Sequence, residues 1–312
     1  MSLQPAVISQ KAVTTDSITI EIVSYDVSAV KHYMYRALQS MQGDPILNGV
    51  LINDNVDPTQ DFIDTSINQS TLYYYALVSE EAASPLVNGL QAYFQFEEES
   101  GSTAFDSHGN FEMSLEIPTG YSLEGDAVFT PNGFINRGVD CRAPGAGIHL
   151  LGATPLYSGE VGSFSFWFRL MSWDSVFSGE YSLLFDSNTA QLRTQGKGTS
   201  IRLRGHGGWT QTIPDNHIVL EQWHHIVVVS DGVDTQMYFD NSLVLTEPEN
   251  TMSMPTNFVL GRHSDLQYDT GTDMVNFCDA YFDEFAVWNR ALTSGEINDL
   301  YNNGNGLTYP FS

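Results

Sequence analysis

Short apolar stretches recur along the whole chain and are separated by glycine, proline, asparagine and aspartate. Residues 18–24 alternate between apolar and polar side chains, which is typical of a β-strand with one buried face. Residues 71–78, 163–169 and 225–229 are rich in β-branched and aromatic side chains, which favour strands. Strands spaced about ten residues apart are typical of a β-sandwich, so the pattern predicts an all-β protein.

One segment near the end predicts a helix, at residues 293–301. Thr293 and, three residues later, Glu296 fit a capping box, in which each side chain accepts a hydrogen bond from the other residue's backbone N–H. The apolar residues that follow recur at the spacing of one helix face. We therefore expect one short helix that packs on a sheet.

Three local features predict details of the same sandwich. The polar pair Asp240-Asn241 lies between two apolar stretches and predicts a hairpin turn. Trp223 is followed by continuous apolar residues, so we expect its ring in the core of the sandwich. His224 and His225 would point to opposite faces of one strand, so they cannot form one metal site together.

A small polar stretch that ends in proline, residues 80–85, follows the predicted strand at 71–78. Stretches of this composition are typical of domain boundaries. The chain of 312 residues is long enough for two ordinary domains. We therefore expect a first domain at residues 1–85 and a second domain at residues 86–312.

The chain has 38 acidic and 12 basic residues, which gives a net charge of −26. Such a surface repels phosphate backbones, so we expect no nucleic-acid partner. The acidic excess has two interpretations. Either it is a solvated surface that keeps the protein soluble, which the scattered distribution favours, or it binds divalent cations, which prefer oxygen ligands.

The cysteines and the first residues of the chain indicate the cellular compartment in which the protein matures. Cys141 and Cys278 are too few for a disulfide framework. They either pair or stay free, and we favour free buried thiols, because cysteine is among the most buried residue types. Residues 1–5 lack the basic and apolar regions of a signal peptide, and no apolar run reaches the length of a membrane helix. We therefore expect no membrane partner and maturation without crossing a membrane.

The first domain resembles a shortened fibronectin type III module. The similarity lies in residues 17–22, 32–37, 62–67 and 71–77. The last of these stretches is similar to the turn and tyrosine-bearing strand of such modules, in which a phenol hydroxyl binds upstream backbone. The tryptophan that is usual on an early core strand is missing, so an immunoglobulin-like sandwich of another family stays open. Both alternatives imply a small β-sandwich.

The second domain resembles the laminin-G-like, concanavalin A-like lectin and glucanase superfamily over residues 89–305. Seven stretches match in the order of that family, including an Asp-Ser-x-Gly-Asn turn, and their order is stronger evidence than any one of them. They are residues 89–101, 104–110, 164–168, 222–228, 237–241, 258–261 and 280–292. The resemblance implies a concanavalin-like jelly-roll β-sandwich that ends in the one short helix.

The resemblance also implies a metal site. Many domains of this family bind one Ca²⁺ near a sheet edge through the aspartate of that turn and oxygen atoms of the penultimate strand. The candidates in this chain are Asp106, Asn110 and Asp283. The alternative is that Asp106 and Asn110 bind only their own turn, while Asp283 caps the end of a strand.

Two further loops are candidates for ligand binding. Residues 206–209, His-Gly-Gly-Trp, would present an aromatic ring for stacking on a sugar, although an ordinary hairpin end is the commoner structure. A second acidic group lies in a loop rich in glycine and threonine, where a solvated face is favoured over a calcium site. Its members are Asp265, Asp269, Asp273 and Asp279.

The sequence contains none of the motifs that would mark an enzyme. Related glucanases carry paired acids on one strand face as Glu-x-Asp-x-x-Glu, which places two carboxylates beside the scissile bond. No such run is present, and Asp283 and Glu284 are expected to face opposite ways as neighbours in a strand. We therefore predict a non-catalytic protein, with no catalytic residues and with Ca²⁺ as its one candidate cofactor.

Two functions remain. Immunoglobulin-like and concanavalin-like domains recur in bacteriophage virions, and residues 300–311 resemble the tails of phage-borne copies. We predict a virion protein, either a capsid decoration protein or a tail or fibre component. It would assemble in the host cytoplasm and bind other virion proteins or itself (a homo-oligomer) through its first domain. The alternative is an extracellular or surface carbohydrate-binding protein of a bacterium, and glycans are candidate partners in both cases.

Overall fold

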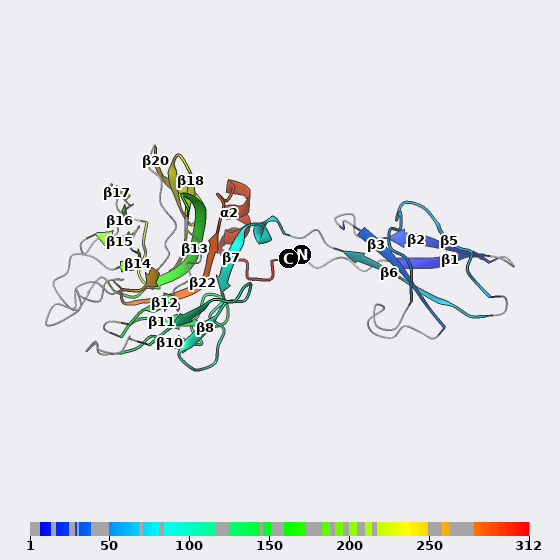
Figure 1. The fold of residues 1–312 in the computed structure, drawn as a ribbon, viewed down its shortest axis with the longest axis horizontal. Coiled ribbons are helices and arrows are strands. Elements are labelled where there is room, and N and C mark those ends of the chain that lie inside the picture. The colour runs from blue at the N-terminus through cyan, green and yellow to red at the C-terminus, as the bar shows by residue number, and fades with distance from the viewer. Residues whose placement is uncertain are drawn as a thin grey trace. The chain divides into compact units, whose positions relative to one another are not determined.

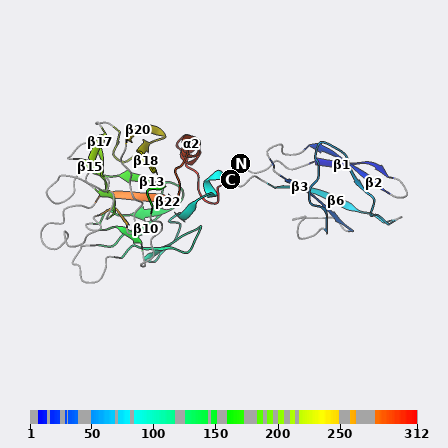
Figure 2. The same ribbon diagram turned by 45° about the horizontal axis from the view of Figure 1, so that its top comes forward.

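The computed structural model shows two compact units, Met1–Ser84 and Pro85–Phe311. The sequence places the boundary after residue 85. Strands run through both units, and the described part of the second unit contains a short α-helix, α2 (Ser294–Tyr301) (Figures 1 and 2). The structure describes residues 7–13, 17–24, 29, 31–38, 50–68, 71–80, 84–116, 125–143, 146–150, 159–172, 183–187, 191–195, 200–204, 210–213, 217–248, 258–262 and 278–311.

The described part of the first unit contains two antiparallel sheets of three strands each. Ile18 and Ile20 from one sheet and Met34 from the other are buried in one apolar cluster, as the alternating pattern predicts. The first sheet has the order β1 (Val7–Val13), β2 (Ile18–Ser24), β5 (Phe62–Asp64), and the second has the order β4 (Val50–Asn53), β3 (Lys31–Ala37), β6 (Tyr74–Glu80).

A buried ion pair joins these two sheets. Arg36 of β3 lies 2.6 Å from a carboxylate oxygen of Asp64 of β5, and Asp64 is only 3% exposed. The hydroxyl of Tyr75 donates to the same oxygen, and the backbone N–H and hydroxyl of Ser66 donate to the other one. Burial alone would raise the pKa of Asp64, but these hydrogen bonds hold it below its usual value.

Tyr73 makes the contact that the resemblance to fibronectin type III modules implies. Its hydroxyl oxygen accepts a hydrogen bond of 2.9 Å from the backbone N–H of Asn68 upstream. The orders β1-β2-β5 and β4-β3-β6 correspond to part of the strand order of immunoglobulin-like sandwiches. The assignment of the first unit to that class stays a prediction.

The second unit contains two larger antiparallel sheets, each with eight described strands. The first, which we call the β13 sheet, has the order β10 (Val128–Thr130), β11 (Gly138–Asp140), β22 (Ala280–Trp288), β13 (Val161–Leu170), β18 (Trp223–Asp231), β19 (Thr235–Phe239), β20 (Ser242–Glu247), and β7 (Leu90–Phe94) also pairs with β22. The second, the β14 sheet, has the order β17 (Thr210–Ile213), β16 (Ser200–Arg204), β15 (Gln191–Gln195), β14 (Leu183–Ser187), β21 (Phe258–Leu260), β12 (Ile148–Leu150), β9 (Glu112–Ser114), β8 (Thr103–Phe105).

The main core lies between the two sheets. Phe164, Phe166 and Phe168 alternate along β13 and point into this core, and Phe164 stacks on Phe185 of β14 with ring centroids 4.5 Å apart. The alternate residues of β13, among them Trp167, point to the other face of the β13 sheet, which we call the outer face. This arrangement confirms the prediction of an all-β sandwich.

A second apolar cluster covers one end of the outer face. The short turn η1 (Pro85–Val87) precedes the first strand of this unit in the chain. The helix α2 (Ser294–Tyr301) and the short turn η3 (Asn302–Gly304) follow its last strand. Ile297 of α2 and Leu86 of η1 are buried against Trp288, whose indole N–H donates to the carbonyl oxygen of Leu86 at 2.7 Å. The helix thus packs on a sheet, as the sequence predicts.

Three of the local predictions can be compared directly with the structure. Asp240 and Asn241 have φ angles of 45° and 65° and form the turn of the β19–β20 hairpin, as predicted. His224 contacts Phe168 of the core, whereas His225 stacks on Trp167 of the outer face, so the two rings do point apart. Both cysteines, Cys141 and Cys278, are free and buried, as favoured.

The prediction for Trp223 was wrong. Its ring is half-buried on the outer face, because it shares that face with Trp167 by strand alternation and lies at the start of β18. Trp167 and Trp288 are the buried tryptophans of the β13 sheet. The candidates at 206–209 and at Asp265, Asp269 and Asp273 lie outside the described residues. Of the helices that the structure describes, none has the length and apolar character that a membrane crossing requires.

The capping box of α2 generates a prediction about stability. The Thr293 hydroxyl accepts from the Glu296 N–H at 3.3 Å, and the Glu296 carboxylate accepts from the Thr293 N–H at 2.8 Å. Substituting Thr293→Ala should lower the free energy of unfolding by about 1 kcal/mol, because the first turn loses a cap. Urea unfolding of the intact chain measures this, and Thr293→Ser, which keeps the hydroxyl, should lie within a few tenths of the parent. Equal losses in both variants would contradict the role of the cap.

Candidate functional site

Asp106, the first predicted metal ligand, follows β8 in a turn that contacts β7. One of its carboxylate oxygens accepts hydrogen bonds of 2.9 Å from the backbone N–H groups of Tyr93 and His108. The other oxygen is buried and has no hydrogen-bond partner among the described residues. A side chain at Gly109 would bring a Cβ atom within 2.6 Å of this second oxygen, so glycine leaves room for the carboxylate there.

Asp283, the third predicted ligand, lies inside β22 and is fully buried. One carboxylate oxygen accepts from the backbone N–H groups of Phe134 and Ile135 at 2.8 and 2.9 Å. The other accepts from the N–H of Glu284 at 2.9 Å. Both oxygens of Asp283 are therefore satisfied by backbone, and the expectation that this residue caps the end of a strand was wrong.

Asn110, the second predicted ligand, is exposed on the turn that follows Asp106. Within the described ranges, no group of three or more His, Cys, Asp and Glu side chains is arranged to hold a metal ion. Of the predicted set, Asp106 has a buried oxygen without a partner, while Asp283 binds three amides. The calcium site stays a prediction, and Asp106 is the residue whose contacts leave room for it.

A β-bulge in β22 places two carboxyl groups on the same face of the sheet. Phe282 and Phe285 both point into the core between the sheets, with two residues between them instead of one. The register with β13 shifts at this point, and Glu284 has a φ of 51°. The expectation that Asp283 and Glu284 face opposite ways was therefore wrong, because the extra residue of the bulge cancels one step of the alternation.

Glu284 is 3% exposed and accepts a hydrogen bond from the hydroxyl of Tyr93. The same phenol oxygen lies 3.0 Å from the carbonyl oxygen of Leu307 in the C-terminal segment. Burial raises the pKa of Glu284 to about 7, and burial together with the charge of Glu284 raises the pKa of Asp283 well above its usual value. The two carboxyl groups of Asp283 and Glu284 therefore favour binding a proton near neutral pH.

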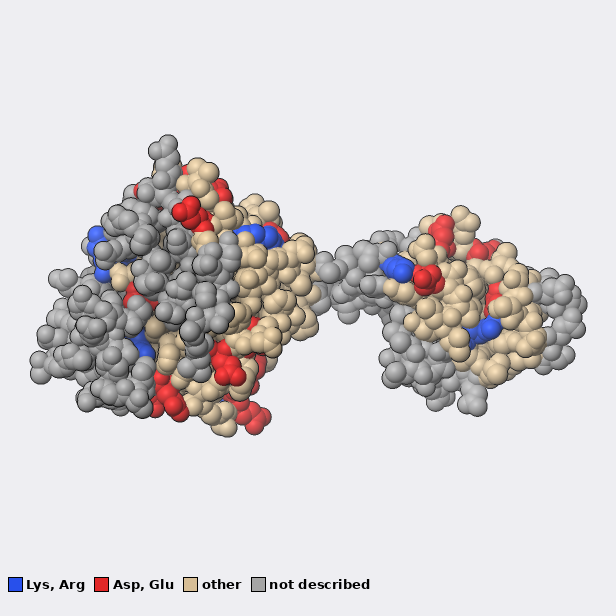
Figure 3. Space-filling view, viewed as in Figure 1, with Lys and Arg blue, Asp and Glu red and all other residues tan. Residues whose placement is uncertain are grey.

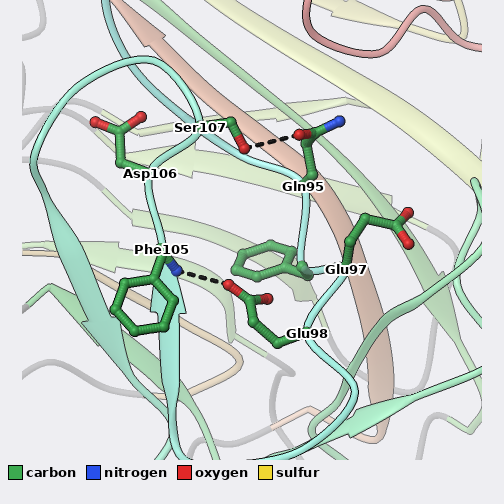
Figure 4. Close-up of a pocket in the computed structure, with 7 residues that line it drawn as sticks. Gln95, Glu97, Glu98, Phe105, Asp106 and Ser107 are labelled. Carbon is green, nitrogen blue, oxygen red and sulfur yellow. Dashed lines mark hydrogen bonds between the residues drawn. The ribbon is translucent and has the colours of Figure 1, made fainter.

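A hollow of about 250 Å³ is lined by the residues that follow β7 and by the end of β8 with the turn after it (Figure 4). The ring of Phe105 is 56% exposed, and the carboxylate of Glu98 accepts from the Phe105 N–H at 2.7 Å. Aromatic, amide, hydroxyl and carboxylate groups thus meet in one concave place. The lining residues are Gln95, Phe96, Glu97, Glu98, Phe105, Asp106 and Ser107.

The polar groups of this hollow are held in place by the C-terminal segment. The amide of Gln95 donates at 2.8 Å to the hydroxyl of Thr308 and to the carbonyl oxygen of Tyr309. Its oxygen accepts from the hydroxyl of Ser107 at 2.7 Å, a contact drawn in Figure 4. All three contacts fix one orientation of the Gln95 side chain, so the hollow is pre-organised before any ligand binds.

Sequence reasoning found one residue of this hollow, Asp106, and missed the others. Phe105 precedes Asp106 in the recognised turn, and its exposure follows from alternation with the buried Ala104. A local signal for Phe105 was therefore present. Gln95 and Ser107 meet only because the turn after β8 hydrogen-bonds to β7, a strand of the other sheet, and no local pattern marks such a pair.

Comparisons with known proteins agree with the architecture. The family model of the concanavalin A-like lectin and glucanase superfamily matches residues 147–298, and the second unit has a concanavalin-like β-sandwich fold. No curated protein sequence matches the chain.

Several solved structures are similar in fold at low identity. The binding domain of botulinum neurotoxin serotype D is 14% identical with a TM-score of 0.49, and the alignment covers 69% of this chain and 52% of that one. Domain 4 of AbnA, an extracellular GH43 arabinanase from Geobacillus stearothermophilus, was solved with arabinotriose. It is 19% identical with a TM-score of 0.48, and the alignment covers 67% of this chain and 97% of that domain. The chain spans about half the length of the toxin domains that it matches.

The buried pair generates a prediction about pH. Unfolded Glu284 titrates near its usual value of 4.5, whereas the folded protein holds the proton up to about pH 7. Because the native state binds more protons in this window, stability falls as the pH rises from 4.5 to 7. Glu284→Gln should match the parent at pH 4.5 and exceed its melting temperature at pH 7.5.

Thermal unfolding at a series of pH values checks this, with Glu112→Gln, at an exposed position of β9, as the matched control. The control removes one carboxylate without touching the pair and should track the parent at every pH. A constant difference between Glu284→Gln and the parent across the range would contradict the buried titration.

Proposed function

We propose that the second unit is a non-catalytic carbohydrate-binding domain and that the chain is an attachment protein. The hollow beside Phe105 carries the first half of this proposal. It combines an exposed aromatic ring with a fixed amide and with carboxylate oxygens. The family description, lectins and glucanases, supports the same class of ligand.

The chemistry of the hollow fits a sugar. A sugar ring has an apolar C–H face that stacks on an aromatic ring, and its hydroxyls donate to carboxylates and amides. Phe105 offers the apolar surface, the carboxylate of Glu98 lies beside it, and Glu97 is a further acidic residue of the lining (Figure 4). The hollow is small, so we expect it to take one or two sugar units of a longer chain.

The contacts of the acidic residues support binding without catalysis. A glycosidase holds two carboxyl groups on either side of the scissile bond, about 5 to 9.5 Å apart, with one of them free to attack or to activate water. Asp283 and Glu284 are instead buried side by side in one strand, where they bind backbone amides and Tyr93. Neither is open to a substrate in this arrangement.

The proposal includes a Ca²⁺ ion that would bind to the turn after β8 and hold its conformation. Asp106 would contribute its free oxygen and Asn110 would contribute from the exposed side of the same turn. Bound Ca²⁺ would neutralise negative charge at the rim of the hollow. Asp283 is left out, since both of its oxygens hold amides.

The first unit supports the attachment role. Leu51, Tyr35 and Ala76 are directly opposite one another on β4, β3 and β6, and Leu51 is 44% exposed. Tyr74 on the same face is 37% exposed. The acidic groups that would repel a second copy of a chain with net charge −26 are missing from this row. We propose that this face binds a second copy of the chain.

The finer assignment is a bacteriophage virion protein, and the alternative is an extracellular carbohydrate-binding protein of a bacterium. The two-unit architecture, one face for assembly and one hollow for glycans, supports both. Mass spectrometry of purified phage particles and of cell-free culture medium separates them. Recovery in particles at stoichiometric amounts favours the virion, and recovery in particle-free medium alone overturns it.

Substituting Phe105→Ala should weaken glycan binding in the hollow, because it removes the stacking surface there. A glycan array followed by calorimetry with the strongest hit measures this. We expect affinity to fall by at least about tenfold, the loss of about 1.4 kcal/mol. Leu243→Ala is the matched control, since Leu243 is 52% exposed on β20 outside the hollow.

Unchanged binding in Phe105→Ala, or an equal loss in the control, would exclude the hollow as the site. The same titration repeated with EDTA tests the calcium brace. If Ca²⁺ braces the turn, EDTA weakens binding in the parent and has no effect in Asp106→Asn.

Substituting Leu51→Asp should prevent self-association, because it places a charge in the apolar row of the first unit. Analytical ultracentrifugation of the full chain measures the oligomer. Ile63→Asp is the control, since Ile63 is 56% exposed on β5 of the other sheet. A monomeric parent, or an oligomer that persists in Leu51→Asp, would contradict docking through this face.

A further inference from the structure

A row of four side chains crosses the outer face of the β13 sheet, away from the end that α2 covers. Asp140 of β11 is directly opposite Tyr281 of β22, Tyr281 is opposite Arg169 of β13, and Arg169 is opposite Trp223 of β18. Residues that are directly opposite in a sheet have side chains on the same face, about 5 Å apart. The row is therefore continuous over four strands.

Arg169 lies between two aromatic rings in this row. Its guanidinium is 4.4 Å from the ring centroid of Tyr281 and 5.3 Å from that of Trp223. No hydrogen bond or ion pair joins it to a described residue, and its Nε atom is buried without a partner. Because Nε is buried, a ligand would meet the terminal Nη1 and Nη2 groups. Stacking leaves those N–H groups unused, because it engages only the faces of the guanidinium.

The described acidic residues near Arg169 interact with a different arginine, Arg142. The carboxylate of Asp140 binds Arg142 in a bidentate pair, with contacts of 2.9 Å to Nε and 2.7 Å to Nη2. The hydrogen bond to Asp140 raises the pKa of Arg142 most, and the charges of Asp140 and, more weakly, Asp279 raise it further. Arg142 itself lies over Tyr281 at 4.7 Å. Arg142 thus has its carboxylate, whereas Arg169 has none among the residues that the structure describes.

Trp223 is held firmly beside this guanidinium. Phe134 packs against its ring edge-on at 5.8 Å, and Phe134 in turn stacks on Trp167 at 3.6 Å. Trp223 is half-buried, and its indole N–H has no hydrogen-bond partner among the described residues. Within the described part of the chain, the row therefore presents a fixed aromatic ring, an indole N–H and a guanidinium without a carboxylate partner.

We propose that Arg169 and Trp223 form a second binding site, specific for a sugar that carries a carboxylate. The planar guanidinium matches the two oxygens of a carboxylate in a bidentate pair. The indole offers an apolar surface to the sugar ring and a donor to a hydroxyl. This site is separate from the hollow at Phe105, and it names a ligand class that the hollow does not require.

The net charge of the chain favours a sugar acid over a phosphate polymer. A chain with net charge −26, with acidic side chains visible on the described surface of both units (Figure 3), repels a densely charged polyanion as a whole. A uronic-acid chain carries one charge per sugar, so a single guanidinium can neutralise the unit that it holds. A local pair of this kind, partly shielded by two aromatic rings, is also less weakened by salt than an exposed one.

Calorimetry with uronic-acid oligosaccharides and their methyl esters tests the proposal, because the two probes differ only in the carboxylate. The full chain should bind at least one acid and bind its ester at least about tenfold more weakly, since a charged hydrogen bond is lost. Arg169→Gln should reduce binding of the acid to the level of the ester. Arg169→Lys, which keeps the charge and loses the planar fork, should fall between them.

Two controls separate this site from the rest of the protein. Arg202→Gln alters another half-buried arginine whose Nε lacks a partner, on β16 of the other sheet, and should leave acid binding intact. Leu243→Ala, which alters a residue 52% exposed on β20, should also leave it intact, and melting temperatures within a few degrees of the parent show that the variants fold. Failure to bind any acid, equal binding of acid and ester, or an equal loss in either control would overturn the proposal.

Discussion

Strand β22 is buried along its whole length, on both faces of the β13 sheet. A strand of this kind needs apolar cover on both sides, because unburied aromatic and aliphatic side chains would contact water. The β14 sheet covers the inner side. On the outer side the cover comes from both ends of the second unit, the turn η1 and the segment from α2 to Phe311. The packing of these two end segments against β22 is the constraint on which the rest of the second unit depends.

The hollow is a consequence of that packing. The C-terminal segment that covers β22 also provides Thr308 and the carbonyl oxygen of Tyr309, which fix Gln95. The same segment lies against Tyr93, whose hydroxyl binds the buried Glu284. A ligand in the hollow would therefore bind a wall whose position is set by the packing of β22. This shared dependence joins the stability of the fold to the geometry of the proposed glycan site.

The two proposed sites use different chemistry on one scaffold. The hollow surrounds an aromatic ring with carboxylates, so it suits the hydroxyls of a neutral sugar or a sugar bound with Ca²⁺. The outer-face row surrounds an arginine with aromatic rings, so it suits a carboxylate. A chain with both would hold a mixed or acidic polysaccharide at two points. Two-point binding raises the effective affinity without requiring either contact to be strong.

The sequence by itself determined the elements and the fold class, and the tertiary structure decided the sites. The alternation at 18–24 and the capping box at Thr293 depend on neighbours in the chain, so both were predicted correctly. The bulge at Asp283 depends on how β13 pairs with β22, and it moved Glu284 to a face that alternation does not predict. The row that contains Arg169 depends on four strands from distant parts of the chain. Which residues meet across a sheet is set by long-range register, and no local pattern in the sequence carries that information.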